Sequence, residues 1–164
     1  MSETRWLTDR EQLIWRSFMT AFHGLTDQLA RQLQRDSGMP YTYYEILVAL
    51  SEAPDRTLRM SDLANLRGSS RSRLSHAVAR LEEAGWVQRR DCPTDKRGAF
   101  AFLTDRGFAA LEAAAPGHVT EVREQLFDKL TPEQVAQLGE ISEAILHGVD
   151  ATSLPCCPDL TGDR

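Results

Sequence analysis

The chain has 164 residues, a mean hydropathy of −0.39 and a formal net charge of −5. This length predicts one domain, or one domain with an added oligomerisation element, and it suffices for a hydrophobic core. No apolar run approaches the ~20 residues that a membrane span needs, and the polar start is unlike a signal peptide, so we expect a cytoplasmic protein.

The charge is distributed unevenly along the chain. Between Arg67 and Arg97 there are eight basic and four acidic residues, a net charge of +4, which leaves −9 for the rest. A basic patch on an acidic body is compatible with a nucleic-acid partner, because the local charge matters more than the sum.

The first predicted element is a long helix. The capping box Thr8–Glu11 marks its start, and Gly38 and Pro40 follow its expected end near Asp36. Apolar residues recur along it at helical spacing: Leu13, Ile14, Phe18, Phe22, Leu25, Leu29 and Leu33.

Two shorter helices should follow. A second capping box, Thr42–Glu45, predicts a helix that Pro54 ends. We expect Ser61 to cap a brief third helix, which Gly68 closes.

A fourth helix is predicted from about Arg71 to Ala84, capped by Ser69 and Ser70. Its apolar stripe is expected in the core and consists of Leu74, Ala77, Val78 and Leu81. Its opposite face carries Ser72, Arg73, Ser75, His76 and Arg80. Gly85 should terminate this helix.

The hydrophobic period then changes from 3.6 to 2. Residues 86–90 and 99–103 are predicted to be two strands joined by the turn DCPTDKRG, with Phe100 and Phe102 on one face. The tip of this hairpin carries Lys96 and Arg97.

The rest of the chain is predicted to be helical up to a polar tail. Thr104 should cap a helix that runs from Asp105 towards Leu130, with a kink or break at residues 113–117. Thr131 and Pro132 start a further helix that ends near Gly148. We expect residues 150–164 to be disordered.

The order of these elements predicts a mainly α-helical chain with a small β wing: a winged helix-turn-helix flanked by long N- and C-terminal helices. In such a unit the second helix enters the major groove of DNA. We therefore expect base contacts from Ser72, Arg73, Ser75 and His76 and phosphate contacts from Ser69, Ser70 and Arg71. At the wing, Lys96 and Arg97 should meet the minor groove or the adjacent backbone, with Asp95 bracing Arg97.

From the fourth helix to residue 107 the sequence resembles the MarR family of bacterial transcription regulators. The segment LSHAVARLEEAGWVQRRDCPTDKRGAFAFLTDRG carries the resemblance, which extends over roughly residues 8–148. The matching positions are Leu81, Glu82, Gly85, Trp86, Val87, Arg89, Arg90, Asp95, Arg97, Leu103, Thr104 and Gly107.

The resemblance implies an obligate homodimer that binds a pseudo-palindromic operator, most often as a repressor. Residues 1–40 and 105–149 would then be the dimerisation helices, residues 41–104 the DNA-binding part and residues 150–164 the tail. The excess of apolar positions in the first and last helices points the same way. The resemblance also implies a small phenolic or anionic effector, for which the candidate contacts are Trp15, His23, Tyr41, Tyr43 and Tyr44.

Other interpretations remain open at this point. The winged helix could be a protein-interaction module, although such a module should expose Leu or Phe where this chain has Ser, Arg and His. The aromatic candidates could instead belong to the core or the dimer interface, and His23, His118 and His147 could be structural or solvated.

The cysteines leave a further mode of regulation open. Cys92 lies near several cations and could sense oxidants, whereas Cys156 and Cys157 are in the polar tail. Three cysteines at these positions predict neither a disulfide framework nor a zinc site. The chain lacks the common catalytic motifs, so we expect no enzymatic activity, metal or cofactor.

Overall fold

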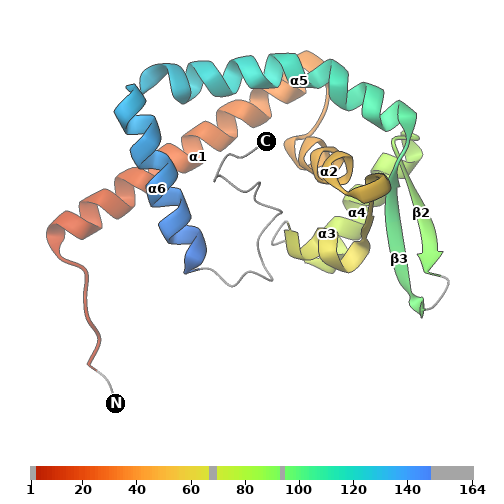
Figure 1. Cartoon of the computed structure of the whole chain (residues 1–164), viewed down its shortest axis with the longest axis horizontal. Helices are drawn as coiled ribbons and strands as arrows, with labels where there is room; N and C mark the ends of the chain where they lie inside the picture. The colour runs from red at the N-terminus through yellow and green to blue at the C-terminus, as the bar shows by residue number, and fades with distance from the viewer. Residues whose placement is uncertain (1–2, 67–69, 93–94, 149–164) are drawn as a thin grey trace.

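The computed structural model describes residues 3–66, 70–92 and 95–148, with the backbone alone for residues 66, 91, 92 and 95–98. Two long helices, α1 (Asp9–Ser37) and α5 (Asp105–Gln125), pack against each other and carry a smaller α/β unit at one end (Figure 1). After the 3₁₀ turn η2 (Phe127–Lys129), α6 (Pro132–His147) completes the helical part. Within the described ranges, no helix has the length and apolar character needed to cross a membrane.

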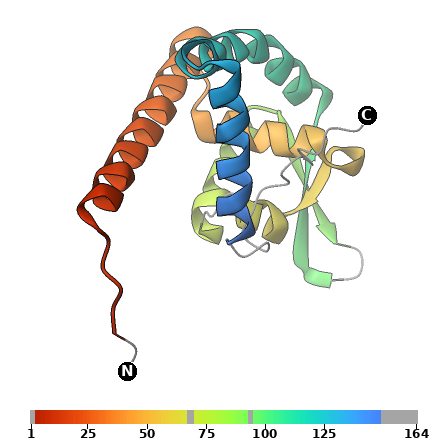
Figure 2. The same ribbon diagram turned by 60° about the vertical axis from the view of Figure 1, so that its left-hand side comes forward.

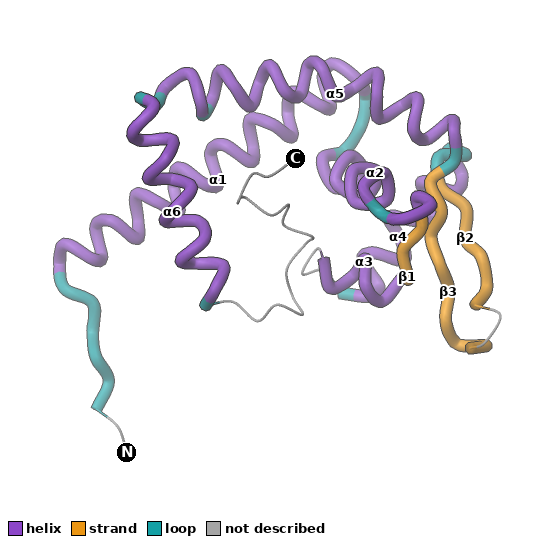
Figure 3. Tube along the Cα trace, in the orientation of Figure 1, coloured by secondary structure: helices purple, strands orange, loops and turns teal. Residues whose placement is uncertain are grey.

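The smaller unit contains three helices and a three-stranded antiparallel sheet (Figure 3). Its helices are α2 (Tyr41–Glu52), α3 (Met60–Leu66) and α4 (Arg71–Glu83). Its strands are β1 (Thr57–Arg59), β2 (Val87–Cys92) and β3 (Asp95–Leu103), in the order β1-β3-β2. The 3₁₀ turn η1 (Pro54–Arg56) leads from α2 into β1. The predicted winged helix-turn-helix architecture is therefore confirmed.

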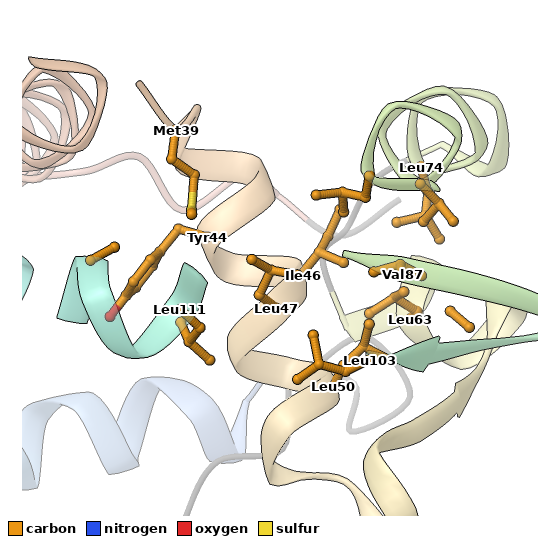
Figure 4. Close-up of a cluster of buried hydrophobic side chains, with 14 of the residues drawn as sticks. Met39, Tyr44, Ile46, Leu47, Leu50, Leu63, Leu74, Val87, Leu103 and Leu111 are labelled. Atoms are coloured by element: carbon orange, nitrogen blue, oxygen red, sulfur yellow. The ribbon is translucent and has the colours of Figure 1, made fainter. Parts of the chain in front are cut away.

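The core of this unit forms around α2 (Figure 4). Ile46, Leu47 and Leu50 of α2 are fully buried against side chains from α3, α4 and the sheet. The apolar stripe of α4 contributes Leu74, Val78 and Leu81, all buried, whereas Ala77 is partly buried. Because α4 is anchored on this side, its opposite side faces outward.

The contact between α1 and α5 includes polar groups. Gln28 Nε2 donates a hydrogen bond to Glu121 Oε1 at 3.0 Å. A Cβ atom on Gly117 would lie 3.1 Å from Gln32 Nε2, so the absence of a side chain lets the two helices approach closely. The N-terminal half of α1 projects away from the rest of the molecule (Figure 2).

Several predicted helix boundaries are confirmed. Thr8 and Thr131 close capping boxes with Glu11 and Gln134, and the Thr104 hydroxyl accepts a hydrogen bond from the Gly107 N–H. Gly38 ends α1 in the left-handed conformation, with φ 62°.

Other predicted boundaries are wrong. Pro40, not Thr42, is the N-cap of α2, because its carbonyl already accepts from Tyr43 and Tyr44 N–H. Ser61 lies inside α3, which begins at Met60. The predicted break in α5 does not occur, since the helix continues through Pro116.

The sheet is larger than predicted. Strand β1 was not expected, and it pairs with β3 from Thr57 opposite Phe102 to Arg59 opposite Phe100. The strands of the hairpin also extend into the predicted turn, where Cys92 is opposite Asp95. Phe100 and Phe102 share one face as predicted, and the alternate residues Ala101 and Leu103 are fully buried on the other.

Candidate nucleic-acid interface

The first turn of α4 is fixed by its cap. The Ser70 hydroxyl oxygen accepts a hydrogen bond from the Arg73 N–H at 3.3 Å, which satisfies one free donor at the helix start. Arg71 is the first helical residue and is exposed. Ser69, the third predicted phosphate contact, lies outside the described residues.

The outward face of α4 carries the predicted base-contacting residues. Ser72, Arg73 and His76 are exposed, and Ser75 is partly buried. All residues of α4 are described, and its large apolar side chains are in the core. The helix therefore offers cations and hydrogen-bonding groups without an exposed apolar patch. This surface suits the edges and phosphates of nucleic acid better than an apolar protein partner.

The hairpin of β2 and β3 projects away from α5 (Figure 1). The backbone of Asp95, Lys96 and Arg97 forms the start of β3. Their side chains lie outside the described part of the chain, as does that of Cys92, so the bracing of Arg97 by Asp95 stays a prediction. Cys156 and Cys157 also lie outside it.

Two arginines of β2 have structural roles that sequence analysis did not assign. The guanidinium carbon of Arg90 lies 4.1 Å from the centre of the Phe102 ring. Arg89 bonds to α4, through the Ser75 carbonyl and the Glu82 carboxylate. The two side chains therefore lie on opposite sides of the strand. Strand alternation could have indicated this, because Arg89 is two residues from the buried Val87 and shares its side of the strand.

The five candidate effector contacts are not gathered in one site. Tyr41 and Tyr44 lie against His118 of α5, with ring centres 6.1 Å and 4.5 Å from the imidazole. Trp15 and His23 are exposed on α1. Tyr43 is partly buried and packs against the core.

His118 is the residue of this cluster that sequence analysis interpreted only as structural or solvated. Burial lowers the pKa of His118 and raises the pKa of Tyr44. Among the described residues, the buried Nδ1 of His118 finds no hydrogen-bond partner. No sequence pattern singles out His118, because it meets the two tyrosines only through the packing of α2 on α5.

A separate hollow of about 340 Å³ lies at the N-terminal end of the molecule. Its walls come from the segment before α1 and from the first turns of that helix: Trp6, Leu7, Gln12, Trp15 and Arg16. Trp15 therefore belongs to a different region of the molecule from the pair Tyr41 and Tyr44.

Comparisons with known proteins agree with this architecture. A family model described as MarR family matches residues 37–98. The crystal structure of Sco3205, a MarR family transcriptional regulator from Streptomyces coelicolor, in complex with DNA, is 56% identical in sequence. It superposes with a TM-score of 0.85, covering 94% of this chain and 96% of that one.

Two further relatives are similar over most of the chain. AbsC, a MarR family transcriptional regulator from Streptomyces coelicolor, is 43% identical, with a TM-score of 0.80 over 88% of this chain and 97% of that structure. The transcriptional repressor MprA of Escherichia coli K12 is 28% identical over 120 residues, which are 73% of this chain and 67% of that protein.

Proposed function

The chain belongs to the MarR family of transcriptional regulators, and on that premise we propose that it binds double-stranded DNA as a sequence-specific regulator. The observation that carries the proposal is the outward face of α4, where Ser72, Arg73 and His76 are exposed opposite the buried side chains of Leu74, Val78 and Leu81. The DNA-bound state of the 56% identical Sco3205 supports the same function. No catalytic activity is part of this proposal.

The contacts would divide between two tasks. Ser72, Arg73, Ser75 and His76 would read base edges in the major groove, as the donors of this face can pair with purine acceptors. Phosphate contacts would come from the start of α4, through Ser69, Ser70 and Arg71. The wing would reach the minor groove through Asp95, Lys96 and Arg97.

The active species would be a homodimer. The projecting half of α1 exposes Leu13, Ile14, Phe18 and other large apolar side chains, and α6 exposes Ile141 and Ile145. Apolar surface of this extent usually marks an interface. A second copy related by a two-fold axis would cover it and present two α4 helices to a pseudo-palindromic operator.

The proposed dimer and the proposed DNA contacts assign a task to each region of the chain. Residues 1–40 and 105–149 would form the dimer and residues 41–104 would bind DNA, whereas residues 150–164 lie outside the described chain. The location would be cytoplasmic, where the DNA is. The regulator would act as a repressor that a small phenolic or anionic effector releases from DNA. Of the candidate effector contacts, Tyr41 and Tyr44 are the better supported, since their two rings meet His118.

Protection footprinting on DNA that flanks the chain's own gene, at two salt concentrations, tests this function. We expect a protected two-fold-symmetric site whose affinity falls steeply with salt, because each phosphate contact releases counterions. A folded dimer that protects no site there, and enriches no sequence from a pool of random duplexes, would contradict the proposal.

A further inference from the structure

The strand β2 is tied to the recognition helix α4 by one side chain, Arg89. Its Nη2 donates a hydrogen bond to the Ser75 carbonyl oxygen at 2.6 Å, and its Nε lies 3.0 Å from Glu82 Oε2. Both charged side chains are only 33% exposed, so this pair is better shielded from water than the neighbouring pair Arg80–Glu83, whose side chains are 66% and 64% exposed. Shielding from water strengthens such an interaction.

The same carboxylate also holds the backbone of the wing. Glu82 Oε1 accepts a hydrogen bond from the Arg89 N–H at 2.9 Å. Strand β2 is at the edge of the sheet, where outward N–H groups have no neighbouring strand to bind. Glu82 therefore replaces a strand partner at this position and joins α4 to the main chain of the hairpin as well as to a side chain.

The two contacts with α4 meet at one guanidinium. Ser75 and Glu82 are seven residues apart in the sequence, but the Ser75 carbonyl oxygen and the Glu82 carboxylate bind adjacent nitrogens of Arg89. Because Glu82 also binds the main chain of Arg89, these contacts together restrict the rotation of α4 about its axis and the swing of the hairpin beside it. Ser75 is itself on the face proposed to read bases, so the attachment begins beside that face.

From this geometry we infer that Arg89 is a positioning residue that, with Glu82, sets the angle between recognition helix and wing. The inference rests on the proposed DNA-binding function and names a determinant of its specificity. Two of the guanidinium nitrogens of Arg89 are already engaged by protein acceptors, which separates its role from that of an arginine free to contact phosphate. Arg89 and Glu82 would act by holding α4 and the wing at the relative orientation that fits one operator half-site.

A matched pair of variants tests this role. Glu82→Ala and Glu83→Ala each remove one negative charge from the last turns of α4, but among the described side chains only that of Glu82 bonds to β2. If charge alone mattered, both changes would strengthen DNA binding equally, because they reduce repulsion of phosphates. If Glu82 positions the wing, Glu82→Ala should reduce preference for the operator despite the more favourable charge.

The measurement is the ratio of affinities for the footprinted operator duplex and for a scrambled duplex of the same length, at fixed salt. We expect Glu82→Ala to lower this ratio by about tenfold, the order expected for losing a charge-assisted hydrogen bond, and Glu83→Ala to leave it unchanged. Equal ratios for the two variants, both at the wild-type value, would overturn the inference while leaving the proposed function intact. A folded wild-type dimer without preference between the duplexes would overturn both.

Hydrogen exchange in the free protein tests the attachment without DNA. The peptide covering β2 should exchange faster in Glu82→Ala than in wild type, and Glu83→Ala should match wild type. The milder Glu82→Gln, which keeps one acceptor oxygen, covers the case in which Glu82→Ala unfolds. Wild-type exchange of β2 in both Glu82 variants would show that the contact does not hold the wing, and would overturn the inference.

Discussion

At the scale of single residues, Gly107 shows why the fold needs a glycine at the start of α5. A Cβ atom there would collide with the Trp86 carbonyl oxygen and come within 2.8 Å of Leu103 Cδ1. Gly107→Ala should therefore destabilise the protein by about 1–3 kcal/mol, as overpacking does, measured by chemical denaturation. Gly24→Ala is the control: Gly24 is exposed in α1 with open space around it, and alanine there should not reduce stability.

Arg73 and Arg71 should differ in what they contribute to DNA binding. Loss of a two-point contact between Arg73 and a base should cost about 1–3 kcal/mol and relax base preference at one operator position. Loss of the proposed Arg71 phosphate contact should weaken binding to all sequences alike and flatten the dependence on salt. Binding of Arg73→Ala and Arg71→Ala to single-substitution operators distinguishes the two roles. Equal relaxation in both variants would contradict this division.

His118 should make the stability of the protein sensitive to acid. Burial holds its folded-state pKa below the value of about 6.5 expected in the unfolded chain, so the unfolded chain binds more protons in the interval between them. Stability should therefore decrease as pH falls below about 6.5, and His118→Phe, which keeps a ring against Tyr44, should reduce that loss. Denaturation midpoints at pH 7.5 and pH 5.5 measure the effect. The control His76→Gln, at an exposed position, should retain the wild-type decrease.

At the scale of elements, the cap of α4 links helix stability to the position of the DNA-binding face. The Ser70 hydroxyl accepts from the Arg73 N–H, and alanine would leave that donor without a side-chain acceptor. Ser70→Ala should cost about 1 kcal/mol of unfolding free energy. Ser72→Ala, at an exposed position two residues further along the chain, leaves the Ser70 cap in place and should leave stability nearly unchanged. Equal losses in the two variants would argue against the cap.

The helices and the hairpin could be predicted because their signals are local. Caps such as Thr8, Thr104 and Thr131 bond to backbone within three residues, so the sequence contains the whole interaction. The same reasoning failed at Thr42, because the carbonyl of Pro40 had already started the helix. It missed β1, whose three residues are too short to show a period and depend on pairing with β3.

The candidate site could be predicted where its residues follow from one helix, but not where they depend on contacts between elements. The outward face of α4 follows from its helical period, and the structure exposes Ser72, Arg73 and His76 there. The bond from Arg89 to Ser75 joins residues fourteen positions apart, and the contact of His118 with Tyr44 joins different helices. Strand alternation places Arg89 on the same side of β2 as Val87, but the partners in both contacts depend on how the elements pack, which residue type and spacing do not encode.

At the scale of the whole molecule, the chain divides its apolar residues between two surfaces. One set fills the core around α2, and the other remains outside on the projecting half of α1 and on α6. Since a stable monomer rarely exposes so many large apolar side chains, the second set should be covered by another copy. Dimerisation would then set the distance between two α4 helices, and so the spacing of the operator half-sites, about one DNA turn apart.

Phe18 offers a test of that arrangement that leaves the protomer core unchanged. It is 47% exposed on α1, and its ring neighbours are Trp15 and Phe22 of the same helix. Phe18→Asp should place a charge in the proposed dimer interface and shift sedimentation from dimer towards monomer, because burying an unpaired carboxylate is costly. Thr20→Asp introduces the same charge at an exposed position two residues further along α1, on the opposite side of the helix from Phe18, and should remain dimeric. In the Phe18→Asp protein we also expect loss of protection over both half-sites, since each α4 would have to bind alone. A Phe18→Asp protein that stays dimeric and protects the full operator would place the interface elsewhere.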